Sequence, residues 1–243
     1  MLSQVVLASY EKPESDGIHK GRLTVTGISP CPYGTYINFH HLDSEVPSPV
    51  ESLRMKNGHW QEMEVLEDLR HAGFNLRYTG TNQLTVHVGK VPVTGRPDGL
   101  IMVDNREDIL SIKAMSLERY TTFKQRGLDA EPLMRCQEQL YLASREFRDI
   151  IVGTWIYVKH KDTCRPYDVF VEKDLGYSGP IIEATEEIIL GNMEVKRPES
   201  CPIPGGCRHR VFCRKEDLLD TSGIRIEEVF LPAKYPMPTP TRN

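Results

Sequence analysis

The stretch Gly95–Lys113, GRPDGLIMVDNREDILSIK, sets out two strands joined by a polar turn. Leu100–Val103 and Ile109–Ala114 are short apolar runs, and a polar segment of turn length separates them. This pattern predicts two neighbouring strands of one sheet. Side chains alternate along a strand, so Ser111 and Lys113 should lie on one face of the second strand.

Two ionisable side chains stand at the edges of this strand pair. Asp98 precedes the first strand and Lys113 lies near the end of the second. A carboxylate placed there can hold a divalent cation, and a lysine beside a phosphate can activate water or offset developing charge. A lysine on an apolar strand is costly unless it has an acidic or phosphate partner. Taken alone, an Asp and a Lys at this spacing more often have no such role.

A helix is predicted from Ser52 to Ala72, where apolar residues recur at three- and four-residue steps and Gly73 supplies an end signal. Near its start, Glu62 could complete a cation site with Asp98. A helix N-terminus also favours Glu for its charge alone. His59 is ambiguous between a metal ligand, a phosphate contact and a residue of the helix cap.

A second helix is predicted from Glu131 to Phe147, and it carries Gln137 and Tyr141 four residues apart on one face. Both side chains could contact a nucleic-acid strand or orient the lysine. The remaining elements complete a mixed α/β core with a Cys-rich C-terminal appendage. The other predicted strands are Arg22–Ile28, Phe74–Thr79, Leu84–Val88, Ile150–Val158 and Tyr167–Glu172, and the other helices are 117–125 and Ile181–Leu190.

Composition indicates a soluble globular protein, with 39% hydrophobic and 26% charged residues in a chain of 243. No apolar run approaches the roughly 20 residues that cross a bilayer. The N-terminus lacks a basic region, so we expect no signal peptide and a cytoplasmic, intracellular location. The net charge of −4 excludes a generally basic nucleic-acid coat but not a local basic groove. Candidate phosphate contacts, or merely solvated charges, are Lys159, His160 and Lys161, and Arg208, Arg210, Arg214 and Lys215.

Together these motifs resemble the PD-(D/E)XK nuclease superfamily in its RecB-type exonuclease branch. Pro97-Asp98 corresponds to the PD and Lys113 to the K, with Gly58 to Glu62 as the first motif and Gln137 to Tyr141 as the helical motif. The resemblance covers residues 55–175. It implies a restriction-endonuclease-like mixed sheet flanked by helices, and DNA as substrate, single-stranded or at duplex ends. It also implies Mg²⁺ or Mn²⁺ held by Asp98 and Glu62, with His59 as a further candidate ligand, while Lys113 positions water.

Ser111 departs from this pattern, because the superfamily places Glu or Asp there as a second metal ligand. Serine lacks the charge, so cation affinity and water activation should fall. A degenerate nuclease and a deliberate substitution that traps substrate both explain it, and the otherwise intact centre favours the substitution. Glu107 and Asp108 are assigned to the turn and are poor replacements. The alternative function is a non-cleaving DNA-binding or assembly subunit of a recombination or CRISPR adaptation complex.

The cysteines predict a cofactor. Four thiolates can hold a 4Fe–4S cluster or a structural zinc. Iron–sulfur nucleases of the RecB-type branch, such as the CRISPR-associated adaptation nucleases, carry one cysteine before the core and three after it. Here these would be Cys31, Cys201, Cys207 and Cys213.

The last three cysteines lie at equal six-residue steps, a wider first gap than the family's, so His209 is a possible substitute ligand. Zinc remains the alternative metal. Cys136 and Cys164 are expected to be small buried residues. The implied organisation is an N-terminal segment 1–54, a nuclease core 55–175, and an iron–sulfur lobe with an extended tail, 176–243, that closes on the N-terminal segment. Partners beyond DNA would be a second copy or recombination and adaptation proteins.

Overall fold

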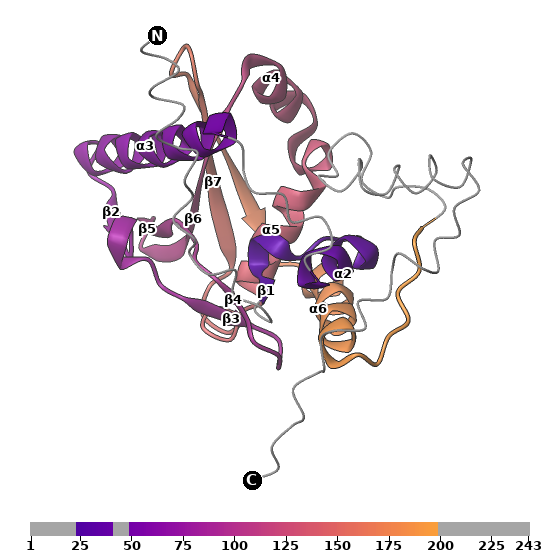
Figure 1. Ribbon diagram of the computed structural model, residues 1–243. Coiled ribbons are helices and arrows are strands. Elements are labelled where there is room, and N and C mark those ends of the chain that lie inside the picture. The colour runs from indigo at the N-terminus through magenta and orange to yellow at the C-terminus, as the bar shows by residue number, and fades with distance from the viewer. Residues whose placement is uncertain (1–22, 41–48, 199–243) are drawn as a thin grey trace. The chain divides into compact units, whose positions relative to one another are not determined.

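A computed structural model describes residues 23–40 and 49–198, which all lie in one unit of the chain, Met1–Gly206 (Figure 1). A five-stranded sheet in the order β2-β5-β6-β7-β8 organises it. Its neighbours are antiparallel except β6 and β7, which run parallel. The strands are β2 (Asn75–Arg77), β5 (Gly99–Val103), β6 (Arg106–Met115), β7 (Gly153–His160) and β8 (Pro166–Glu172).

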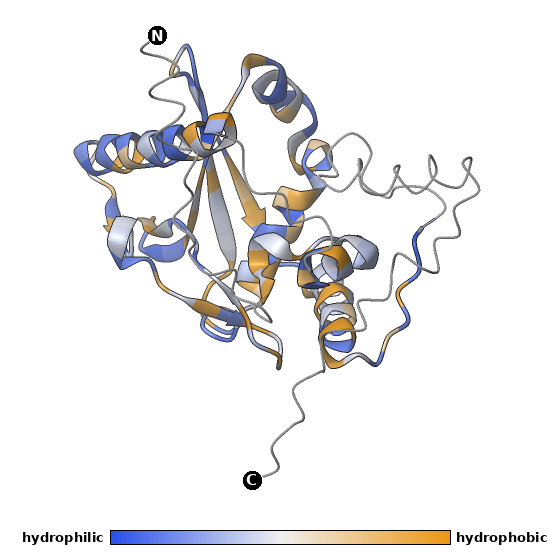
Figure 2. Ribbon diagram, in the orientation of Figure 1, coloured by the Kyte–Doolittle hydropathy of each residue, from blue (hydrophilic) through white to orange (hydrophobic). Residues whose placement is uncertain are grey.

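Helices cover both faces of this sheet. α3 (Pro49–His71) lies on one side of β6 and β7, and α4 (Leu117–Arg126) and α5 (Pro132–Leu142) lie on the other (Figure 1). α4 and α5 also form the crossover that the parallel pair β6 and β7 requires. Figure 2 shows that α3 is largely hydrophilic. Its buried residues Val65, Leu66 and Leu69 pack against Leu110 and Ile112 of β6 and Ile101 of β5.

A second, smaller sheet has the order β1-β4-β3. Its strands are β1 (Leu23–Thr24), β3 (Val86–Val88) and β4 (Val93–Gly95), and the 3-10 turns are Val25–Gly27, Gly80–Asn82 and Gly127–Ala130. The valines of this sheet share a hydrophobic cluster with Leu140 and Tyr141 of α5. α2 (Pro32–His40) contacts α6 (Leu175–Leu190), and α6 packs Tyr177, Ile181 and Ile182 onto the same cluster.

The strand pair predicted from Gly95–Lys113 is confirmed, but its turn lies elsewhere. Asp104 and Asn105 form the turn, with φ of +49° and +60°. Positive φ at both central residues is what a two-residue hairpin turn needs, and Asp and Asn tolerate it. Glu107 and Asp108 are therefore strand residues, paired with Met102 and Ile101. Their assignment to the turn was wrong.

Other predicted boundaries also shift. Of the described part of the predicted strand Arg22–Ile28, only Leu23–Thr24 forms a strand, and α5 ends at Leu142 rather than Phe147. β7 begins at Gly153, so Ile150 and Val152 lie outside it with exposed side chains. The first residue of β7, Gly153, must lack a side chain, because a Cβ there would meet Cζ of the Phe170 ring at 2.2 Å. α2 and β4 were not predicted, since both are short and lack a clear apolar period.

Among the described helices, none combines the length and apolarity needed to span a membrane. Cys136 is buried, as predicted, and burial raises the pKa of its thiol to about 12, so it stays protonated and unreactive. Cys164 is exposed, with φ of +56°, in the loop between β7 and β8, so its predicted burial was wrong.

Candidate active site

Asp98 lies between the two sheets, in the link from β4 to β5. The glycines on either side of it permit a close approach of neighbouring elements. A Cβ on Gly95 would meet Cε1 of Tyr141 at 2.6 Å, and one on Gly99 would meet Cγ2 of Thr79 at 2.5 Å. Larger residues at these two positions would push the link away from α5 and from the segment after β2.

The Asp98 carboxylate is fixed against β6. Its Oδ2 accepts a 2.6 Å hydrogen bond from the main-chain N–H of Ile112 and lies 3.9 Å from Nζ of Lys113. Both side chains are partly accessible, with 19% and 23% of their surfaces exposed. The predicted pair is therefore brought together, Asp98 from the β4–β5 link and Lys113 from β6, with access from solvent.

Ser111 lies on the same face of β6 as Lys113, as alternation predicts, and this face meets α5. Its hydroxyl is buried and donates a 2.8 Å hydrogen bond to Oε1 of Glu138. The same Glu138 oxygen lies 3.9 Å from Nζ of Lys113. Lys113 is thus flanked by two carboxylates, Asp98 from the β4–β5 link and Glu138 from α5.

Glu138 is an acid in an unusual position, with none of its surface exposed. Burial raises the pKa of its carboxyl to about 7, while the Lys113 charge and the Ser111 hydrogen bond act in the opposite direction. Its second oxygen, Oε2, is buried and has no hydrogen-bond partner among the described residues. A buried carboxylate oxygen without a partner is costly, so it needs either a proton or a cation.

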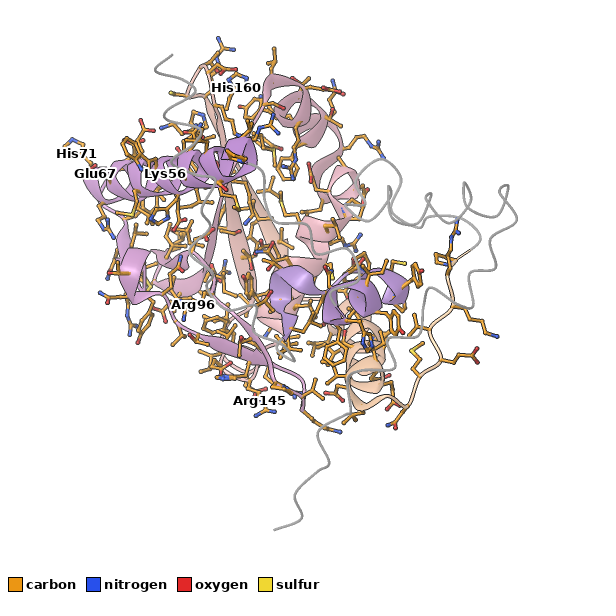
Figure 3. The ribbon with its side chains drawn as sticks, viewed as in Figure 1. Lys56, Glu67, His71, Arg96, Arg145 and His160 are labelled. Atoms are coloured by element: carbon orange, nitrogen blue, oxygen red, sulfur yellow. The ribbon has the colours of Figure 1, made fainter. Side chains whose placement is uncertain are left out.

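The helical motif Gln137 to Tyr141 contacts the link that carries Asp98. Nε2 of Gln137 donates to the Tyr141 hydroxyl at 3.3 Å, which confirms the shared face. The Tyr141 hydroxyl in turn donates to the carbonyl of Arg96 at 3.1 Å. Tyr141 is buried, and burial raises its pKa. It therefore holds the Arg96–Asp98 link, and Arg96, labelled in Figure 3, carries its own side chain into solvent.

Glu62 lies in the middle of α3, not near its start, because the helix begins at Pro49. Helix N-terminal charge therefore does not explain it. Burial raises the pKa of Glu62, and the nearby Asp98 charge raises it further. Its carboxylate accepts from Gln83 at 3.2 Å and lies 3.6 Å from Nδ1 of the exposed His59.

Within the described residues, no group of three or more His, Cys, Asp or Glu side chains converges as a ready-made metal site. The predicted set of Glu62, Asp98 and His59 is thus not assembled into one. A magnesium site needs less, since one or two carboxylates usually hold the ion together with water and substrate phosphate. Asp98 and Glu138 provide two, and the unpartnered Oε2 of Glu138 is a suitable ligand atom. The residues present therefore fit a divalent cation.

Glu138 was missed, although a signal existed. Met134, Glu138 and Tyr141 recur at the spacing of one helix face, and all three are buried. An acid at such a position is a candidate functional residue, because charged side chains are rarely buried without a partner.

Two sets of charged residues near the site have other partners. Asp108 accepts from Arg106 at 2.9 Å and from Trp155 at 3.3 Å, and Glu107 binds Arg77 at 2.9 Å, so neither reaches Lys113. Lys159, a candidate phosphate contact, is buried, and Glu64 and Asp68 of α3 hold it at 3.0 and 3.6 Å. His160 is buried too. The second basic cluster, Arg208 to Lys215, lies outside the described residues.

Of the predicted cluster ligands, only Cys31 is described. It is buried just before α2, and its main-chain N–H donates to Oγ of Ser29 at 3.1 Å. Cys201, Cys207, Cys213 and the alternative ligand His209 lie outside the described residues, so the 4Fe–4S cluster stays a prediction.

Solved structures with a similar fold include an alkaline exonuclease. No family model and no curated protein matches the chain. The structure of LHK-Exo in complex with dAMP superposes with a TM-score of 0.52 at 10% identity, over 90% of this chain and 98% of that one. LHK-Exo is an alkaline exonuclease from Laribacter hongkongensis. The structure of SSO0001 gives a TM-score of 0.50 at 16% identity, over 88% and 96%. The chain therefore shares the mixed α/β fold of these structures.

Proposed function

We propose that this protein is a divalent-metal-dependent DNA nuclease that acts as an exonuclease. The observation that carries the proposal is the placement of Asp98, in the β4–β5 link, 3.9 Å from Lys113 of β6, with both side chains accessible to solvent. The fold shared with an alkaline exonuclease supports it.

Each residue of the centre has a role in phosphodiester hydrolysis. The Lys113 ammonium can hold an attacking water and offset the charge that develops on the phosphate. Asp98, fixed by the Ile112 N–H, presents its carboxylate toward the same space. A bound Mg²⁺ or Mn²⁺ would polarise the phosphate and lower the pKa of its water. Tyr141 and Gln137 keep the link that carries Asp98 in place.

A DNA strand also needs a binding surface outside the catalytic centre. On α3, His59, Trp60 and Met63 line a hollow of about 640 Å³ together with Glu64, Glu67 and Arg70. Trp60 is 68% exposed. An exposed aromatic ring can stack on a base, which holds single strands without sequence preference. In Figure 3, the labelled Glu67 lies along the same helix.

End-labelled linear DNA and covalently closed circular DNA of the same sequence test the activity. With Mn²⁺ we expect the purified protein to shorten the linear DNA and to leave the circle intact, because an exonuclease needs an end. Nicking of the circle would indicate an endonuclease instead. Binding of both DNAs without cleavage would favour the non-cleaving assembly subunit.

The iron–sulfur cluster is proposed as a second, structural cofactor with Cys31, Cys201, Cys207 and Cys213 as ligands. Metal and acid-labile sulfide analysis of anaerobically purified protein should find about four irons per chain. Cys31→Ser should lower that content, whereas Cys136→Ser, which changes a thiol outside the ligand set, should not. Zinc without sulfide would contradict the cluster and favour the structural zinc.

A further inference from the structure

A carboxylate of α5, that of Glu138, occupies the place where an acidic residue at position 111 of β6 would put its own carboxylate. Ser111 projects from β6 toward α5, and its hydroxyl ends 2.8 Å from Oε1 of Glu138. A longer acidic side chain at 111 would have to enter the space that this carboxylate occupies. The helix thus places a carboxylate where the strand would otherwise have delivered one.

The ammonium of Lys113 lies at equal distances from two carboxylates. Its Nζ lies 3.9 Å from Oδ2 of Asp98 and 3.9 Å from Oε1 of Glu138. The two acids approach the ammonium from different elements, the β4–β5 link and α5. Two carboxylates and one lysine therefore converge on a single point of the sheet.

The two carboxylate oxygens of Glu138 differ in their contacts. Oε1 accepts from Ser111, while Oε2 is buried and has no hydrogen-bond partner among the described residues. A merely structural partner of Lys113 would gain from hydrogen bonds on both oxygens. The unused oxygen is the atom that a cation would bind.

We propose that Glu138 is the second metal-binding carboxylate of the centre and that Ser111 orients it. This inference rests on the proposed nuclease function, and the contacts of Glu138 are the observations that support it. It replaces the interpretation of Ser111 as the residue that switches the enzyme off. Ser111→Glu alone should then not increase activity, because it would place a second carboxylate against that of Glu138.

The test compares Mn²⁺ affinity, measured by calorimetry and by paramagnetic resonance without DNA, in the wild type, Glu138→Gln and Ser111→Glu/Glu138→Gln. We expect Glu138→Gln to weaken Mn²⁺ binding about 10- to 100-fold, and the double variant to recover most of it. DNA cleavage should follow the same order. Glu131→Gln is the matched control, since Glu131 lies directly before α5 and forms an ion pair with Arg119.

Unchanged Mn²⁺ affinity in folded Glu138→Gln would overturn the proposal. Should that variant fail to fold, the double variant decides: affinity near the wild type supports the proposal, and lost affinity in a folded double variant overturns it. The proposed function fails separately. If the wild type binds Mn²⁺ through Glu138 but cuts no DNA, Glu138 remains a metal ligand and the proposed nuclease function is wrong. If Glu138→Gln cleaves DNA as well as the wild type and binds Mn²⁺ with unchanged affinity, the nuclease function stands and the role of Glu138 is wrong.

Discussion

Asp98→Asn is expected to reduce DNA cleavage by about 10³-fold or more, because a metal ion supplies several kcal/mol of transition-state stabilisation and each 1.4 kcal/mol is about tenfold in rate. The substitution removes the charge that would hold the cation. It retains a carbonyl oxygen that can still accept from Ile112 N–H, so the β4–β5 link should keep its place. Initial rates with Mn²⁺ and the thermal unfolding midpoint should be measured together.

The matched control is Asp129→Asn, since Asp129 is 76% exposed and forms a long ion pair of 3.6 Å with Arg135. It should cleave like the wild type. Cleavage by Asp98→Asn at a wild-type rate, in a folded protein, would remove Asp98 from the centre.

Lys113→Met is expected to lower cleavage by about 10²- to 10³-fold, the usual cost of losing one charge-stabilising donor. Methionine keeps most of the length and apolar volume of the lysine stem, so β6 should remain packed. Mn²⁺ affinity should be retained or increase, because the ammonium that competes for Asp98 and Glu138 is gone. This separation of the two effects distinguishes a catalytic lysine from a structural one.

Lys124→Met is a suitable control, because Lys124 lies on α4, where its ammonium lies over the Tyr120 and Tyr167 rings. Equal cleavage by Lys113→Met and the wild type would contradict the assignment of Lys113. A joint loss of cleavage and metal binding would mean that Lys113 holds the site together rather than acting in the reaction.

Local patterns in the sequence predicted the strands that carry the site. Apolar runs with polar breaks located β5 and β6, and alternation put Ser111 and Lys113 on one face of β6. Asp98 could be paired with Lys113 because the two lie at the ends of adjacent strands. These are short-range properties, so they can be recognised without knowledge of the tertiary structure.

The partner of Ser111 could not be predicted in this way. Glu138 is 27 positions further along the chain, and the crossover through α4 and α5 brings it to β6. Sequence spacing gives no indication of that contact. The same holds for Lys159, whose run of basic neighbours suggested a phosphate contact although two acids of α3 bind it.

Tyr141 illustrates a residue whose position was predicted and whose role was not. The spacing to Gln137 placed both on one face of α5, and that contact is present. Its burial and its bond to the Arg96 carbonyl depend on the close approach that Gly95 permits. Such a contact follows from the packing of α5 against the smaller sheet, which a pattern within one helix does not reveal.

The most direct measurement is the release of acid-soluble nucleotides from linear duplex DNA by the purified wild type, with Mn²⁺ and again after excess chelator, beside Lys113→Met. Metal-dependent hydrolysis at the Asp98–Lys113 centre predicts a steady release that stops on chelation and falls about 10²-fold or more in the variant. Release that persists without metal, release equal in the variant, or bound DNA that stays intact with Mn²⁺ would contradict it.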